Sequence, residues 1–182
     1  MIAGLASGNA NAEGLLHPTG EFAARFMIIA MAITPLRMLF PKARWPVWLM
    51  RRRRYFGVAA FLYAVLHTVL YIVDMQTLKA MLDEFFALGI WTGWAAFAIF
   101  LPLGFTSNNA SQRWLLSAWQ PLQRWVYGAA LLTLVHWMFV HNNFGPALVH
   151  FVPLALLQGY RVWKLIRGKQ SGSALDPATP TP

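Results

Sequence analysis

The chain has 182 residues, of which 58% are hydrophobic and 12% charged, and its formal net charge is +9. This composition is too apolar for an ordinary soluble domain and is typical of a polytopic membrane protein. The chain has no cysteine, which excludes disulfides, thiolate-ligated iron–sulfur clusters and haem attached covalently through Cys-x-x-Cys-His. The basic residues stand at the ends of apolar segments, where they act as topology signals, so we predict no nucleic-acid partner.

The two ends of the chain differ from its middle. Residues 1–16 are small and polar and lack the basic start and long apolar stretch of a signal peptide, so we expect a flexible periplasmic segment. Residues 168–182 are rich in proline, serine and glycine and are expected to form a disordered cytoplasmic tail. Residues 17–167 are expected to form one transmembrane domain, in which no internal repeat is evident.

Five apolar segments follow one another through this domain. They cover residues 21–40, 55–74, 85–104, 122–141 and 145–166. Each is long enough to cross a hydrocarbon core of about 30 Å as a helix. The prolines within them are tolerated where neighbouring helices satisfy the freed carbonyl groups. We therefore predict an all-α integral membrane protein, a bundle of five transmembrane helices.

The connections between these segments differ in charge. The loop over residues 41–54 ends in the arginine run 51–54, and more basic residues lie in the third connection and near the C-terminus. The opposite side has Lys79 and the acidic residues Asp74, Asp83 and Glu84. This asymmetry predicts an N-terminus outside and a C-terminus in the cytoplasm of a multi-pass protein of the bacterial inner membrane. The arginine run is expected to contact anionic membrane lipid.

Two histidines lie inside the apolar segments. His67 is 12 residues above Tyr55 and His136 is 14 residues above Leu122, which correspond to depths of about 18 Å and about 21 Å. An ionisable ring in hydrocarbon is costly and usually marks a site, and imidazole is a common haem ligand. Two rings at similar depth can bind one iron from both sides. We therefore predict that His67 and His136 bind the iron of a non-covalent haem b near the outer face.

Small residues lie on the helix faces below these histidines. They are Ala64, Ala60 and Gly57 below His67, and Ala129 and Gly128 below His136. Such stripes leave room for a flat macrocycle between helices, although small residues also allow helices to pack closely. A second, deeper haem would need ligands at Arg54 and Gln123. Arginine stays protonated and glutamine is a poor iron ligand, so we predict one haem per chain.

The remaining histidines, His17, His141 and His150, lie on the outer side. Each is explained simply as an interfacial polar residue with access to water. His150 is the best further candidate for cofactor binding, because it could donate a hydrogen bond to a haem propionate. His17 and His141 could also contact propionates or a partner. We expect the outer surface near His17, the 75–84 loop and residues 141–143 to dock an electron acceptor.

Several short motifs carry a family resemblance. They are HPTG at 17–20, ITPLR at 33–37, Arg54 with FGVAAFLYAVLH at 56–67, TSN at 106–108, and Trp119, Leu122, Arg124, Tyr127 and His136. In this order they resemble the ferric-reductase-like transmembrane family, and within it the haem-binding subunits of periplasmic methionine sulfoxide reductase systems. The resemblance covers about residues 17–141.

The resemblance implies a cytochrome b that passes electrons to a periplasmic molybdenum enzyme, which reduces methionine sulfoxide in proteins. The family's haem histidines map onto His67 and His136. A further family histidine maps onto Gln123, and we expect the chain to lack the family's extra first helix. Association with FMN is also implied, but no residue here can be assigned to it.

We therefore expect one-electron relay from quinol or a cytosolic flavin reductase to the periplasmic enzyme. A membrane quinol is the physically easier donor, because a single outer haem leaves a long gap to the cytoplasm. One alternative is a stand-alone ferric or other metal reductase. Another is a non-redox scaffold or transporter in which the histidines join helices. The sequence leaves open whether the chain is an enzyme by itself.

Overall fold

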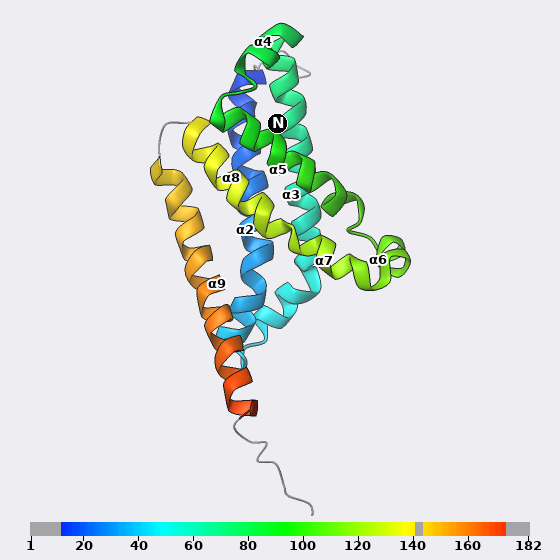
Figure 1. The fold of residues 1–182 in the computed structure, drawn as a ribbon, viewed down its shortest axis with the longest axis vertical. Coiled ribbons are helices and arrows are strands. Elements are labelled where there is room, and N and C mark those ends of the chain that lie inside the picture. Colours follow the sequence, from blue (N-terminus) through cyan, green and yellow to red (C-terminus); the bar gives the residue numbers. More distant parts are fainter. Residues whose placement is uncertain (1–11, 141–143, 174–182) are drawn as a thin grey trace, which may run out of the picture.

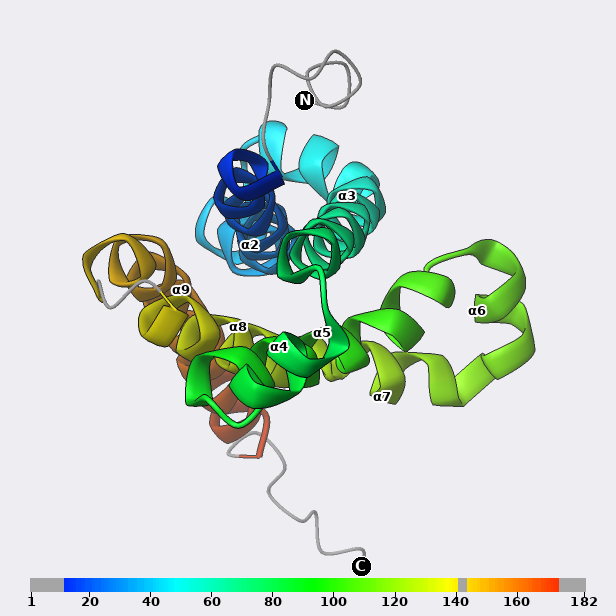
Figure 2. The ribbon, with the colours of Figure 1, turned by 90° about the horizontal axis from the view of Figure 1, so that it is seen from above.

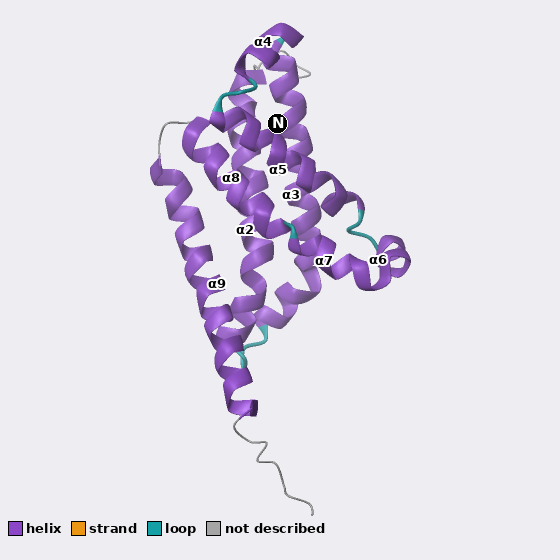
Figure 3. Ribbon diagram, in the orientation of Figure 1, coloured by secondary structure: helices purple, strands orange, loops and turns teal. Residues whose placement is uncertain are grey.

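The computed structural model describes residues 12–140 and 144–173, and every regular element in this part of the chain is a helix (Figure 3). The predicted all-α class is therefore confirmed. His141 and most of the predicted N-terminal segment lie outside the described residues. The helices at the two ends extend further than the predicted domain, because they begin at Ala12 and end at Ser173.

Five long helices form the described bundle (Figure 1). They are α2 (Ala12–Leu39), α3 (Trp45–Met75), α5 (Leu88–Phe105), α8 (Val126–Val140) and α9 (Phe144–Ser173). The connections contain α4 (Leu78–Glu84), α6 (Asn109–Leu115), the 3₁₀ helix η1 (Leu116–Ala118) and α7 (Trp119–Arg124). Seen from above, the α6–α7 connection projects sideways from the bundle (Figure 2).

Local chemistry explains several helix ends. Pro46 occupies the first turn of α3, where its missing N–H would have no intrahelical partner. At the end of α5 the Pro102 carbonyl accepts both the Thr106 N–H at 3.0 Å and the Thr106 hydroxyl at 2.6 Å. The Asn108 side chain accepts the Ser111 N–H at 2.7 Å and caps α6.

Two segments predicted as loops are partly helical. The arginine run 51–54 of the 41–54 segment lies in α3, which begins at Trp45, and the 75–84 segment contains α4. Hydrophobic periodicity detects only the apolar part of a helix. Polar turns that continue the same helix are therefore not predicted. The helix α3 has 31 residues and is about 46 Å long at 1.5 Å per residue, which places its arginines beyond a hydrocarbon core of about 30 Å.

Among the residues that the structure describes, three helices are long and apolar enough to be candidate membrane spans by themselves: α2 over Gly14–Leu39, α3 and α5. The predicted fourth span, 122–141, is wrong as a single helix, because α7 ends at Arg124 and α8 begins at Val126. The helix α8 has 15 residues, about 22 Å at 1.5 Å per residue. The predicted third span also begins later, at Leu88. The confirmed result is an all-helical membrane protein with three clear spans.

The helices pack in two antiparallel pairs, α2 with α3 and α5 with α8, and α9 covers α2. Small residues at the helix contacts, among them Ala24, Ala60, Ala129 and Ala147, are buried in the core. Small side chains let membrane helices approach closely. In each pair the first helix runs away from the α4 end of the bundle and the second returns toward it (Figure 1).

Candidate functional site

A cavity of about 520 Å³ lies between α2, α3, α5 and α8 and reaches the α4 end of the bundle. Its walls are mostly apolar, and both His67 and His136 line it. This volume lies within the range of about 300–1,000 Å³ that is usual for ligand and cofactor sites. The two histidines, which are 69 positions apart in the sequence, are therefore brought to one cavity.

The two imidazole rings lie close together and nearly perpendicular in the cavity. Their centroids are 6.1 Å apart and their planes are 79° from parallel. A metal–imidazole bond is about 2.0 Å, and the centroid lies about 1.2 Å behind the nitrogen, so rings that share one metal have centroids about 6.4 Å apart. The spacing of His67 and His136 fits a single metal atom between them.

Backbone carbonyls fix the direction of both rings. The Nδ1 atom of His67 lies 2.9 Å from the Leu16 carbonyl oxygen, and that of His136 lies 2.6 Å from the Gly89 carbonyl oxygen. A carbonyl oxygen can only accept, so each Nδ1 donates its proton, and in the neutral ring Nε2 then carries the lone pair. Metal-bound histidines in proteins usually have this arrangement.

The residues that line the cavity come from two helix pairs at corresponding positions. Each α2 residue in the wall has an α5 counterpart in the wall 73 positions later: Leu16, His17, Gly20, Glu21, Ala23 and Ala24 correspond to Gly89, Ile90, Gly93, Trp94, Ala96 and Phe97. A shift of 69 positions likewise relates Ala64, His67, Thr68 and Tyr71 on α3 to Thr133, His136, Trp137 and Val140 on α8. The chain thus contains a structural repeat that is not evident in its sequence.

This repeat gives the cavity two equivalent sides. The pair α2–α3 presents His67 and the pair α5–α8 presents His136. A planar macrocycle that carries one metal has two equivalent faces with one axial position on each. The symmetry of the cavity therefore matches a metalloporphyrin such as haem.

The small residues that open this cavity are not the predicted ones. Of the stripes below the histidines only Ala64 lines the cavity. Ala60 and Ala129 are buried in the helix contacts, and a side-chain carbon at Gly57 would have no neighbour within 4 Å. Helix packing therefore explains most of the stripes. The cavity is opened instead by glycine and alanine on α2 and α5.

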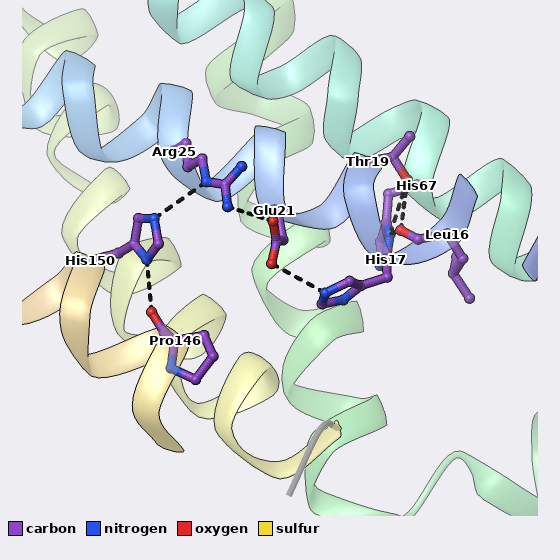
Figure 4. A network of polar contacts seen from close by, with 8 residues as sticks. All are labelled: Leu16, His17, Thr19, Glu21, Arg25, His67, Pro146 and His150. Atoms are coloured by element: carbon purple, nitrogen blue, oxygen red, sulfur yellow. Dashed lines mark hydrogen bonds and ion pairs between the residues drawn. The ribbon is translucent and has the colours of Figure 1, made fainter. Parts of the chain in front are cut away.

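A row of polar side chains runs along α2 near the cavity (Figure 4). His17 Nε2 lies 3.1 Å from Glu21 Oε1, and Arg25 donates to the other Glu21 oxygen. Arg25 Nε donates to His150 Nε2 at 3.3 Å. His17 and Glu21 line the cavity, whereas Arg25 does not. Sequence patterns alone do not single out Glu21 and Arg25, although their i, i+4 spacing marks one face of a helix.

His150 itself does not line the cavity. Its Nδ1 atom donates to the Pro146 carbonyl at 2.7 Å, and its ring lies against Trp137 with the centroids 5.3 Å apart. Trp137 does line the cavity, so it separates His150 from the space between the two haem-ligand candidates. His150 lies six residues into α9.

One buried polar atom in the wall lacks a partner. The Tyr71 hydroxyl is buried, has no hydrogen-bond partner among the described residues, and belongs to a side chain that lines the cavity. A buried hydroxyl left unpaired is unfavourable, so a ligand oxygen at this position would stabilise it. Two neighbouring imidazoles and one open hydroxyl donor fit haem, which offers an iron and carboxylate groups.

The positions considered for a second haem have other contacts. The Gln123 side chain donates to Thr106 Oγ1 at 3.1 Å and to the Leu103 carbonyl at 3.3 Å. Arg54 donates to Asn109 and Gln112. Neither Arg54 nor Gln123 lines the cavity that contains the histidines.

Residues 19–134 match the sequence model of the family described as the ferric reductase like transmembrane component. The match includes His67 and ends two residues before His136.

The chain is also 34% identical over 171 residues to a protein of Xanthomonas euvesicatoria named protein-methionine-sulfoxide reductase heme-binding subunit MsrQ, covering 90% of this chain and 77% of that protein. A protein of the same name from Polaromonas naphthalenivorans is 38% identical over 159 residues, with coverages of 84% and 71%. No solved structure matches the chain. This chain belongs to the ferric-reductase-like transmembrane family.

Proposed function

We propose that the chain is a haem-binding electron-transfer subunit of the bacterial inner membrane, in which His67 and His136 bind the iron of one b-type haem. The main support is the pair of imidazole rings of His67 and His136, whose centroids are 6.1 Å apart. The Nδ1 atom of each ring donates to a backbone carbonyl. When bound, haem iron supplies one-electron transfer by alternating between its ferric and ferrous states. The names of the relatives, which are haem-binding subunits, support this proposal.

The protein's own part is to bind and orient the cofactor and to exclude water. The Leu16 and Gly89 carbonyls hold the imidazole protons on Nδ1, so that Nε2 of each ring is presented to the metal. The Tyr71 hydroxyl would donate to a carboxylate of the cofactor. His150 does not line the cavity, so its proposed role is indirect: it accepts a hydrogen bond from Arg25 and so helps to position the polar row on α2.

One haem per chain is the proposed stoichiometry. Gln123 is held by Thr106 and the Leu103 carbonyl, and Arg54 by two side chains of α6. Phe61 also lies against Gly104, where an added side-chain carbon would overlap its ring. These contacts support a packed region between the cavity and the arginine-rich end of α3.

We further propose a five-span topology with the N-terminus and the cavity on the periplasmic side. The basic end of α3 and the basic second half of α9 support a cytoplasmic location for that end of the bundle. The short helix α8 would complete its crossing together with α7, since the two are separated by Trp125 alone. Reporter fusions that place the end of α9 in the periplasm would contradict this topology.

The electron donor is proposed to be membrane quinol, with a cytosolic flavin reductase or bound FMN as the alternative. A cavity near the periplasmic face lies far from a cytosolic nicotinamide donor, whereas a quinol diffuses within the membrane. The proposed acceptor is a periplasmic molybdenum-containing methionine sulfoxide reductase. The names of the relatives support an acceptor that is a methionine sulfoxide reductase.

The direct experiment is to purify the full chain after haem-replete expression and to record its oxidised and reduced visible spectra. We expect the spectrum of a low-spin haem with two imidazole ligands and about one haem per chain by pyridine haemochrome assay. A ratio near two would contradict the single site. Absence of a Soret band would favour the non-redox scaffold or transporter.

A second measurement identifies the acceptor. The dithionite-reduced protein is mixed with a methionine sulfoxide reductase plus oxidised protein substrate, and haem reoxidation is followed. The proposal requires reoxidation that depends on that partner. Rapid reoxidation by ferric chelate alone would favour the stand-alone metal reductase.

A further inference from the structure

The buried polar side chains among the described residues are two threonines, each followed by a glycine. Thr19 is 0% exposed and Thr92 is 2% exposed, and they are succeeded in the chain by Gly20 and Gly93. The two Thr-Gly pairs occupy equivalent positions, 73 residues apart, on α2 and α5. Each pair lies beside one of the two cavity histidines, because Gly20 contacts His67 and Gly93 contacts His136.

Both threonine hydroxyls bond to carbonyls of the preceding turn. Thr19 Oγ1 lies 2.8 Å from the Leu16 carbonyl oxygen and 2.9 Å from that of Leu15. Thr92 Oγ1 lies 3.0 Å from the Gly89 carbonyl oxygen and 2.6 Å from that of Leu88. The Leu16 and Gly89 carbonyls are the same two that accept the histidine Nδ1 protons. Hydroxyl bonds of this kind bend a helix locally. The hydroxyl therefore acts on both the direction of the carbonyl and its capacity to accept the imidazole proton.

The glycines give the rings access to those carbonyls. A side-chain carbon at Gly93 would lie 2.6 Å from His136 Nδ1, and one at Gly20 would lie 3.0 Å from His67 Cε1. Real carbon contacts are almost never closer than 3.0 Å, so any larger residue at 93 must displace the His136 ring. In each helix, glycine stands four residues after the accepting carbonyl, which is the neighbouring position on the same face.

We propose that Thr19-Gly20 and Thr92-Gly93 are paired positioning elements that set the plane of each imidazole and the strength of its Nδ1 hydrogen bond. They would thereby set the basicity of Nε2 toward the iron, since a stronger Nδ1 bond makes the ring a better ligand. This role rests on the proposed function of His67 and His136, and it assigns four residues that do not themselves contact the iron.

The first test exchanges each glycine for alanine in the full chain. Gly93→Ala and Gly20→Ala should weaken haem binding about 10–100-fold, as losses of outer-shell contacts at metal sites do, with the larger effect at Gly93. Gly57→Ala is the matched control, because nothing lies within 4 Å of the added carbon. Wild-type haem affinity in both variants would overturn the proposal.

Electron paramagnetic resonance gives a readout that general destabilisation would not produce. Nearly perpendicular axial imidazoles leave two iron d orbitals almost equal in energy, so the ferric low-spin signal is strongly anisotropic. The rings are 79° from parallel, and displacing one of them should reduce that anisotropy in whatever haem the glycine variants retain. The Gly57→Ala signal should match the wild type.

The threonines provide a milder test that keeps the proposal falsifiable if the glycine variants do not accumulate. Thr19→Val keeps the shape but removes the hydroxyl, whose nearer acceptor is the Leu16 carbonyl. That carbonyl should then accept the His67 proton more strongly, and the haem midpoint potential should fall. Thr19→Ser should restore the wild-type potential. Equal potentials in the valine and serine variants would overturn the role of the hydroxyl.

A haem-free measurement separates this proposal from the proposed function. In apoprotein held in detergent, the rate at which diethyl pyrocarbonate modifies His136 should rise in Gly93→Ala and stay unchanged in Gly57→Ala. A wild-type protein without a Soret band would contradict haem binding, but the modification rates would still test whether Gly93 positions the His136 ring. Equal rates in all three proteins would contradict that positioning.

Discussion

The two helix pairs that enclose the cavity share a framework and differ at its rim. Both present a histidine, an accepting carbonyl, a buried threonine and a glycine at matching positions. The first pair carries the polar row His17, Glu21 and Arg25. The corresponding residues of the second pair are Ile90, Trp94 and Ala98.

This difference separates two tasks. The shared features all act on the imidazoles, so they suit the binding of a cofactor with two equivalent faces. The polar row occurs on one side only and lies toward the α4 end, so it suits the adjustment of charge near the cofactor and contact with water or a partner. A carboxylate in an apolar wall influences a nearby redox centre strongly, because the surroundings screen charge weakly.

The largest expected effect tests the equivalence of the two pairs. His67→Ala and His136→Ala should each abolish stable haem binding, because losing either axial ligand opens one face of the iron. The Soret absorbance per chain measures this loss. Gln123→Ala is the control and should retain the wild-type haem content. Loss of haem in Gln123→Ala, together with a wild-type haem content in either histidine variant, would show that the ligands are assigned wrongly.

A smaller effect tests the difference between the pairs. Glu21→Gln removes a negative charge from the cavity wall, which should raise the haem midpoint potential by on the order of tens of millivolts, because a nearby anion favours the ferric state. Potentiometric titration measures the shift. Asp83→Asn is the control, since Asp83 does not line the cavity. A potential that falls in Glu21→Gln would contradict this account of the polar row.

Tyr71 and Val140 occupy equivalent positions, and only Tyr71 carries a hydroxyl. Tyr71→Phe should leave the haem-free protein as stable as the wild type, because the hydroxyl has no partner to lose among the described residues. The same variant should release haem a few-fold faster to an acceptor apoprotein, since one donated hydrogen bond contributes about 1 kcal/mol. Unchanged haem release would remove Tyr71 from cofactor binding.

The smallest expected effect concerns the acidic residues near the rim. Reversing the charges of Asp83 and Glu84 should slow haem reoxidation by a basic partner surface at low ionic strength. The haem spectrum should stay intact in the Asp83 variant, because Asp83 does not line the cavity, whereas Glu84 does. Stopped-flow rates at two salt concentrations measure this. A rate that is the same in wild type and variant at low salt would exclude these carboxylates from docking.

Part of this site could be predicted from the sequence, because an ionisable side chain in an apolar helix is conspicuous. His67 and His136 were identifiable for this reason, and their similar depth follows from counting residues along helices. The all-helical class follows from the apolar segments. Depth along a helix depends on local geometry alone, which sequence spacing gives directly.

The contacts that position the two imidazole rings could not be predicted from the sequence, because they depend on how each helix is rotated about its axis relative to its neighbour. Thr19 and Thr92 are ordinary residues in the sequence, and only their packing reveals that they share carbonyls with histidines 48 and 44 positions later. Rotation also explains why Ala60 and Gly57, on the same stripe as Ala64, do not line the cavity. A small residue on the right face of one helix does not reveal which neighbour fills the space.

The central claim is that both imidazoles bind one iron with their planes nearly perpendicular. The most direct measurement is the low-temperature electron paramagnetic resonance spectrum of the oxidised, purified wild-type protein, with haem and protein quantified in the same sample. We predict a single, strongly anisotropic low-spin ferric signal that accounts for one haem per chain, because the ring planes are 79° from parallel. A predominantly high-spin signal, or two distinct low-spin signals from two haems, would contradict the account.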